Sequence, residues 1–198
     1  MRLTGRTPFR VMLDFDTGSL MPFAGSFIRR LSEMAGAYED QAAVSGLLAS
    51  GDDPVVYTGY DASVPSEPGH LLFRTTIITP GAVGSEYFMT KGHHHVRDSA
   101  EIYLGMSGEG IMLMETRAGE FAESKLVPSA SVYVPPGWAH RTVNTGNVPL
   151  IFFAVYAGDA GHDYESLERS GFSRRVHRGP SGPELRPVRP TASGLVAG

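Results

Sequence analysis

Between residues 55 and 156 the sequence is a series of short runs of β-branched, aromatic and other apolar residues, separated by glycine, proline or Asn-Gly-like breaks. The runs are VVY (55–57), HLLFRTTIIT (70–79), YFMT (87–90), EIYLGM (101–106), GIMLME (110–115), SVYV (131–134) and LIFFAVY (150–156). Short runs at a spacing of roughly 8–12 residues are typical of an all-β sandwich or barrel. The last run is apolar throughout, so we expect it to form a strand that is buried on both faces.

The segments on either side of this series look different. Residues 1–54 are expected to form an N-terminal extension with one short helix over residues 39–50, because EDQAAVSGLLAS starts with acids, continues with good helix formers and is followed by Gly51 and Pro54. Residues 55–175 are expected to form a single barrel. Residues 176–198 are expected to be an extended tail, since GPSGPELRPVRPTASGLVAG from residue 179 onward is rich in proline and glycine and has no periodicity.

Composition narrows the class of protein. The chain has 198 residues, 41% of them hydrophobic, and a formal net charge of -4, which fits one globular domain with a sizeable core. A mildly acidic chain with scattered charges argues against a nucleic-acid partner. The absence of cysteine excludes disulfides and thiolate sites. No apolar run reaches the length of a signal peptide or a membrane span, so we expect a cytoplasmic protein with no membrane partner.

Three consecutive histidines occur inside the chain, in the stretch TKGHHHVRD. On a strand, alternate side chains point to opposite faces, so His93 and His95 would share one face and His94 would point away. Imidazole suits iron, nickel, copper and zinc, and a carboxylate commonly completes such a ligand set. Glu101 opens the next strand-like run, and His140 follows a tight Pro-Pro-Gly turn. We therefore predict a site for one divalent metal ion at His93, His95, Glu101 and His140, with positions left open for substrate.

The same residues carry a family resemblance. The order H-x-H, then E and G, followed by P-x-G-x2-H-x3-N, resembles the two-part signature of the cupin superfamily and occurs here at His93, His95, Glu101, Gly108, Pro135, Gly137, His140 and Asn144. Tyr87 and Ser129 stand where the signature has glycines, and five residues separate His95 from Glu101 instead of three or four. The resemblance implies a cupin domain, a double-stranded β-helix or jelly-roll barrel.

A narrower resemblance is carried by EYFMTKGHHH, AEIY, YVPPGWAHRTVNTG and FAVYAGDAGHDY, which are similar to the archaeal-type, cupin-fold glucose-6-phosphate isomerases over roughly residues 31–175. This family resemblance implies metal-dependent interconversion of glucose 6-phosphate and fructose 6-phosphate by a homodimer. It implies one divalent ion per subunit, with Fe²⁺ as the first candidate and Ni²⁺, Mn²⁺ or Zn²⁺ as the others.

The resemblance also implies roles for further residues. The phosphate would be bound by the residues Thr76, Thr90, Gly92 (through its backbone) and Tyr164, which offer hydroxyl and N–H donors. Tyr103 would line the sugar site beside Glu101, and Tyr57 is a further candidate for its wall. Tyr156 and His162 would lie at the mouth, where opening of the sugar ring requires proton transfer. We assign no ligand role to His70, His177 or Lys91.

Two mechanisms and two other functions stay open. In the enediol route Glu101 removes the C2 proton as a base, and in the hydride-shift route hydrogen migrates directly between C2 and C1. We favour the enediol route because a carboxylate can loosen from a metal while substrate binds. The chain is alternatively another cupin enzyme, such as an isomerase of a related sugar phosphate or a non-haem dioxygenase, or a non-catalytic sugar-binding cupin. A dioxygenase would not need Thr90, Gly92 and Tyr164 together, and a sugar sensor usually carries a helical DNA-binding domain.

Overall fold

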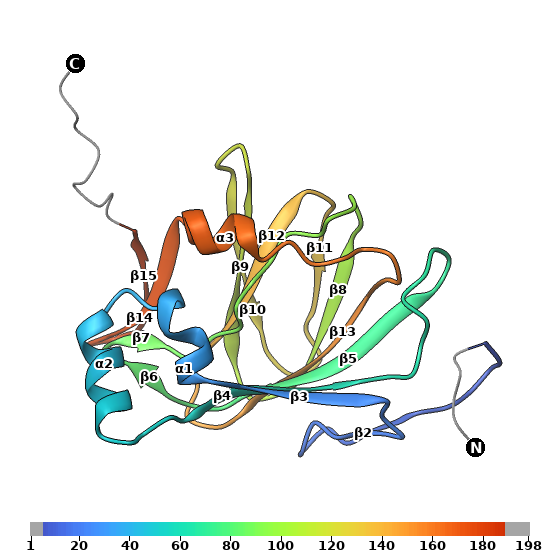
Figure 1. The fold of residues 1–198 in the computed structure, drawn as a ribbon, viewed down its shortest axis with the longest axis horizontal. Coiled ribbons are helices and arrows are strands. Elements are labelled where there is room, and N and C mark those ends of the chain that lie inside the picture. The colour runs from blue at the N-terminus through green and yellow to red at the C-terminus, as the bar shows by residue number, and fades with distance from the viewer. Residues whose placement is uncertain (1–5, 189–198) are drawn as a thin grey trace.

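A six-stranded antiparallel sheet forms the larger wall of a barrel in the computed structural model, which describes residues 6–188 (Figure 1). The strand order is β11-β8-β13-β5-β4-β3. The strands are β3 (Gly25–Arg30), β4 (Val55–Asp61), β5 (Leu71–Ile78), β8 (Glu101–Ser107), β11 (Ser131–Val134) and β13 (Leu150–Ala157). The last of these, β13, is hydrogen-bonded along its length to β5 on one side and to β8 on the other.

A three-stranded sheet in the order β10-β9-β12 forms the opposite wall, with β9 (Gly110–Thr116), β10 (Phe121–Leu126) and β12 (Trp138–Asn144). Single bridges from Met89 to Val143 and from His93 to His140 connect the segment after β7 to this wall. A four-stranded sheet in the order β15-β14-β7-β6 contains β6 (Ala82–Val83), β7 (Glu86–Tyr87), β14 (Arg174–Gly179) and β15 (Gly182–Pro187). The strands β1 (Met12–Leu13) and β2 (Leu20–Met21) form a separate pair.

Helices are few and short. α1 (Leu31–Met34), a 3₁₀ turn (Ala35–Ala37) and α2 (Gln41–Ala49) lie beside the four-stranded sheet, and α3 (Glu165–Ser170) lies over one end of the barrel (Figure 1). α2 lies within the segment 39–50, where a helix was expected, and begins where the Asp40 side chain accepts a hydrogen bond from the Ala43 amide at 2.8 Å. None of the described helices is both long and apolar enough to span a bilayer.

The hydrophobic core lies between the walls of the barrel. Side chains such as Ile78, Leu113, Leu126 and Leu150 are at most 1% exposed. Burial of one such side chain stabilises the fold by roughly 1.5–3 kcal/mol. The run LIFFAVY forms the central, largely buried strand β13 as predicted, and the prediction of an all-β cupin barrel is confirmed.

Two segments differ from the sequence prediction. β3, within the expected N-terminal extension, pairs with β4 and forms the edge of the six-stranded sheet. The expected tail after residue 176 instead continues β14 and returns as β15, so it is a β-hairpin up to Pro187. Its Gly-Pro-Ser-Gly break is the turn of this hairpin, which places Val176 and Leu185 against the core. The remaining residues of the expected tail, 189–198, lie outside the described part of the chain.

Candidate functional site

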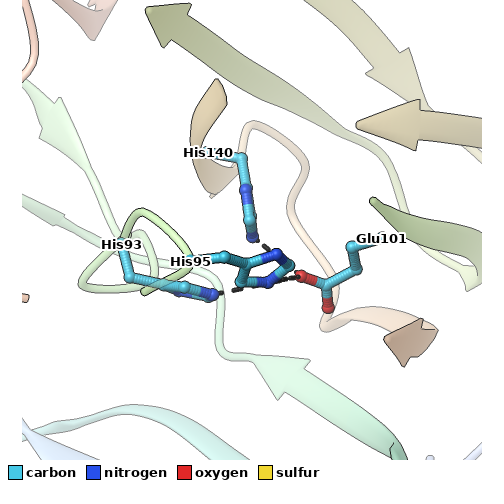
Figure 2. A group of neighbouring side chains, drawn as sticks. All are labelled: His93, His95, Glu101 and His140. Carbon is cyan, nitrogen blue, oxygen red and sulfur yellow. Dashed lines mark hydrogen bonds and ion pairs between the residues drawn. The ribbon is translucent and has the colours of Figure 1, made fainter. Parts of the chain in front are cut away.

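Three imidazole rings and one carboxylate converge inside the barrel (Figure 2). The Nε2 atoms of His140, His95 and His93 lie 2.9, 3.2 and 3.9 Å from Glu101 Oε2. Their potential ligand atoms all lie within 4.8 Å of one another. Glu101 is the first residue of β8, His140 lies in β12, and the other two histidines follow β7. The four predicted metal ligands are therefore brought together.

The backbone explains which histidines point inward. The amide of His93 donates to the carbonyl of His140 at 3.2 Å, and the amide of His140 donates back at 3.1 Å. This bridge brings the two rings to a centroid distance of 4.4 Å. The neighbouring residue His94 instead bridges to Asp163, and its side chain lies in a separate cavity beside Arg117. The alternation expected for a strand is present, although only isolated bridges form here.

Carbonyl groups orient two of the rings. The Nδ1 atom of His95 lies 2.8 Å from the Ser99 carbonyl oxygen, and that of His140 lies 3.3 Å from the Trp138 carbonyl oxygen. A carbonyl can only accept, so each Nδ1 carries a proton, and each Nε2 faces the centre of the cluster, where its lone pair would be available to a bound metal ion. This is the outer support that metal-binding histidines usually have.

The donor set fits a divalent cation. Among residues 6–188, the buried Nε2 atoms of His93 and His140 have no hydrogen-bond partner. Buried polar atoms without a partner are rare and call for an explanation. Three imidazole nitrogens and one carboxylate oxygen that face a common centre are a set that first-row divalent ions accept. The arrangement therefore fits the predicted metal.

Electrostatics within the cluster favour an ionised Glu101 carboxylate beside a neutral His93 ring. Burial opposes ionisation of Glu101, but its interactions with the His140, His95 and His93 rings outweigh burial and hold the pKa of the carboxyl below its usual range. Burial, followed by repulsion from His140 and His162, holds the pKa of His93 well below 6.5. Neutral imidazole and charged carboxylate are the forms that bind metal.

A cavity of about 240 Å³ opens above the cluster. Its lining includes every residue to which the sequence prediction gave a role in substrate binding or proton transfer: Tyr57, Thr76, Thr90, Gly92, Glu101, Tyr103, Tyr156, His162 and Tyr164. The segments that carry them are separated by up to about 100 residues in the sequence. Their convergence on one cavity is what an active site requires.

Hydroxyl and amide groups gather at one part of this cavity. Thr90 Oγ1 accepts a hydrogen bond from the Thr142 amide at 3.1 Å, which leaves its own O–H free to donate. Gly92 has a φ of +74°, and a Cβ there would lie 2.7 Å from Phe172 and 3.1 Å from the His140 carbonyl oxygen. Only glycine adopts this conformation at so close an approach without strain.

Two further ionisable groups lie over the metal ligands. The His162 ring is 4.3 Å from that of His93 and 5.4 Å from that of Tyr156. Burial, followed by the charge of Arg74, lowers the pKa of His162 to about 4. Burial raises the pKa of Tyr156 to about 12. At neutral pH His162 is therefore a neutral proton acceptor next to a neutral phenol.

The prediction missed several residues that line the cavity, including Phe27, Arg29, Arg74, Lys91, Thr142 and Phe152. Arg74 pairs with Asp61 at 2.9 Å and lies over the Tyr156 ring at 5.5 Å. Strand alternation predicts that Arg74 lies on the same face as Thr76, because residues two apart in a strand share a face. No comparable signal existed for Arg29, since β3 was not predicted.

Solved structures of an oxalate oxidase and of CapF from Staphylococcus aureus match about half of the chain at TM-scores of 0.41 and 0.42 and identities of 16% and 17%, which is too distant to support an argument.

Proteins related in sequence are much more similar to this chain. The glucose-6-phosphate isomerase of Thermococcus gammatolerans is 47% identical over 172 residues, which is 86% of this chain and 89% of that protein. The glucose-6-phosphate isomerase of Sinorhizobium medicae is 38% identical over 168 residues, which is 84% of this chain and 78% of that protein. The family model for glucose-6-phosphate isomerase (GPI) matches residues 28–179. By this match and these relatives, the chain belongs to the glucose-6-phosphate isomerase family.

Proposed function

We propose that the chain is a metal-dependent isomerase that interconverts glucose 6-phosphate and fructose 6-phosphate. The observation that carries the proposal is the placement of the His93, His95, Glu101 and His140 cluster at the base of the same cavity that Thr76, Thr90 and Gly92 line. An aldose–ketose isomerase needs both parts, because it must polarise two oxygens at C1 and C2 and hold a phosphate several bonds away.

The three histidines and Glu101 would hold one divalent ion, with Fe²⁺ as the first candidate. When bound, the ion supplies Lewis-acid polarisation of the substrate oxygens. The buried Nε2 atoms without partners support this assignment more directly than the sequence spacing does.

Glu101 is the proposed base. Its Oε2 atom faces the histidines, and the other carboxylate oxygen points away from His140 (Figure 2). The carboxylate is 4% exposed and ionised, so it can remove a proton from C2 and return one to C1. General-base assistance of this kind typically contributes 10²–10⁴-fold.

Tyr156 and His162 are the proposed pair for ring opening. His162 can accept the proton of the anomeric hydroxyl because its pKa of about 4 keeps it neutral at pH 7. Tyr156 is protonated at that pH and can donate to the ring oxygen. Their ring centroids are 5.4 Å apart, which leaves both within reach of one sugar ring.

The phosphate would be bound by the hydroxyls of Thr76, Thr90 and Tyr164 and by the amide of Gly92. Tyr103 would contact the sugar between this group and Glu101. The positive charges of Arg29 and Lys91, which line the same cavity, favour an anionic substrate there.

We further propose a homodimer. The outer face of the six-stranded sheet exposes Ile102 and Tyr133, which are paired across β8 and β11 and are 44% and 60% exposed. Exposed apolar side chains that adjoin one another are typical of association surfaces. Light scattering at known concentration would give twice the chain mass, and replacement of Ile102 and Tyr133 by lysine would shift it toward the monomer.

The direct test is a coupled assay for conversion of fructose 6-phosphate, run on protein as purified, after chelation, and after return of single divalent ions. Activity should vanish with the chelator and recover with at least one ion, Fe²⁺ first. Activity that is indifferent to thorough chelation would contradict metal dependence. Turnover of a different sugar phosphate with fructose 6-phosphate inert would contradict the substrate.

A further inference from the structure

A second cavity, of about 370 Å³, lies beside the active-site cavity and shares Lys91 and Tyr164 with it. Its other walls come from α1 and the 3₁₀ turn that follows it, from β12 through Arg141, and from β14 through Arg175. Apart from these two shared residues, no residue that lines the second cavity has a functional role proposed above. Its distinguishing feature is two guanidinium groups on its wall.

Arg141 is buried without a counter-ion. It is 5% exposed, and its Nη2 donates to the Lys91 carbonyl at 2.7 Å. Its Nε atom has no hydrogen-bond partner, and no carboxylate of the described chain lies within 4 Å of the group. A buried arginine is normally paired, because desolvation of an isolated charge is strongly unfavourable. Among the side chains that the structure describes, none supplies a paired counter-charge for Arg141.

Arg175 adds a second positive charge on the same wall. Its Nη1 donates to Glu86 at 2.7 Å and to the Ala37 carbonyl at 2.6 Å, and its buried Nε atom has no partner in residues 6–188. Burial, followed by the positive charge of Arg175, lowers the pKa of Arg141 to about 10. The two cations in the cavity lining thus repel each other, and a bound anion would relieve that repulsion.

The one carboxylate among the lining residues that the structure describes, Glu33, is already engaged. Its oxygens accept from Arg29 Nη1 at 3.3 Å and from the Arg30 amide at 2.9 Å. It is therefore not the counter-ion of Arg141. The balance of charge in the cavity stays positive.

We propose that this cavity binds a phosphoryl group, with Arg141 and Arg175 as its hydrogen-bond donors. Guanidinium groups match the geometry of phosphate oxygens and bind them in preference to neutral ligands. A dianion between two guanidinium groups would compensate the charge that the protein leaves unpaired. The site is separate from the substrate cradle at Thr76 and Thr90, and it contacts the active site only through Lys91 and Tyr164.

Binding in the second cavity can affect the active site through the backbone of Lys91. The Lys91 carbonyl is held by Arg141, and the next two residues along the chain are Gly92 and the metal ligand His93. A bound anion that draws Arg141 toward itself would therefore shift the backbone that positions Gly92 and His93.

The test uses the metal-loaded protein, with inorganic phosphate titrated in a calorimeter. The key variant is Gly36→Glu, with Gly36→Gln as its matched control. Gly36 lines the cavity, and a Cβ there would meet no atom within 4 Å, so both side chains can start from this position without a clash. Phosphate should bind the wild type and Gly36→Gln equally and bind Gly36→Glu at least about tenfold more weakly, since a new carboxylate repels the dianion. Arg141→Gln should weaken phosphate binding to a similar degree. If Arg141→Gln does not fold, the comparison of Gly36→Glu with Gly36→Gln still tests the proposal.

A second arm identifies the source of the phosphoryl group. If fructose 6-phosphate binds twice per wild-type chain and once per Gly36→Glu chain, the ligand is a sugar phosphate. If fructose 6-phosphate binds once and a Gly36→Glu-sensitive site for inorganic phosphate persists in its presence, the ligand is free phosphate. The proposal is overturned if Gly36→Glu and Gly36→Gln bind phosphate alike, or if phosphate binding is lost in Thr90→Val and unchanged in Gly36→Glu. None of these readouts requires isomerase activity.

Discussion

The Nδ1 atom of His95 lies 2.8 Å from the Ser99 carbonyl oxygen, while the Nε2 atom of the same ring lies 3.2 Å from Glu101 Oε2. The loop of residues 96–100, longer than the cupin signature has, folds back to supply this carbonyl. The extra length does not remove Glu101 from the cluster. It provides the acceptor that fixes the orientation and the protonation of a ligand ring.

Removal of a ligand should remove the metal. We expect His93→Ala and His140→Ala to lower bound metal at least about tenfold, because each takes away one of four donors. His94→Phe is the matched control, since its side chain lies in a different cavity. Elemental analysis of the purified variants measures the stoichiometry. An undiminished metal content in His140→Ala, or a loss in His94→Phe as large as in His95→Ala, would contradict the site.

Glu101→Gln separates ligation from proton transfer. Glutamine keeps one ligating oxygen but cannot act as a base, so activity should fall by at least about a hundredfold in protein fully loaded with metal. An enediol intermediate also lets the transferred proton exchange, so product formed by the wild type in heavy water should contain deuterium, as mass spectrometry would show. An active Glu101→Gln variant together with no deuterium in the product would instead support the hydride shift.

Recognition of the substrate should depend on its phosphate. Free fructose should be turned over at least about a hundredfold less efficiently in kcat/KM, because binding energy remote from C1 and C2 would no longer position them. Thr76→Val should raise KM for the sugar phosphate while leaving the poor turnover of the free sugar unchanged. Comparable turnover of fructose and fructose 6-phosphate would rule out a sugar phosphate as the preferred substrate.

Gly92→Ala should be more destabilising than a positive φ alone explains. Gly119 has a φ of +89° with open space around it, whereas a Cβ at Gly92 would lie 2.7 Å from Phe172. Alanine at a positive φ costs about 1–2 kcal/mol. Denaturant unfolding should therefore give about this loss for Gly119→Ala and a larger one for Gly92→Ala. Equal losses would show that Phe172 moves aside freely.

The metal-free protein should lose stability as the pH falls from about 6.5 to about 4, partly through His162. Its pKa is about 4 in the fold against an ordinary value of 6.5, so in this window the unfolded chain binds more protons and acid favours unfolding. His162→Gln lacks this contribution. The free energy of unfolding of the wild type, compared with that of His162→Gln, should fall by about 1–3 kcal/mol more across the window. Parallel pH profiles would show that His162 titrates normally.

Much of the site could be predicted because strand alternation is a local rule. His93 and His95 were separated from His94 by that rule alone, and the inward placement of Tyr103 beside Glu101 follows from it as well. Arg74 was missed although the same rule, applied from Thr76, places it on the inner face.

Other parts of the fold had no local signal. β3 alternates in burial only because it pairs with β4, and its sequence GSFIRR does not alternate in polarity. The hairpin of β14 and β15 contains prolines and a Gly-Pro-Ser-Gly break that also suit an irregular tail. The hairpin is stabilised by contacts of Val176 and Leu185 with the core. These contacts join residues that are far apart in the sequence, so local sequence patterns do not predict them.

The position of β13 has a consequence for the newly made chain. β5 and β8 pair with β13 and not with each other, so each keeps an open edge until residues 150–157 have been synthesised. At about 5–20 residues per second, β8 waits roughly 2.5–10 s on the ribosome for its partner. During that interval two apolar strands present unpaired backbone, and premature termination before β13 would leave an aggregation-prone product without an isomerase site.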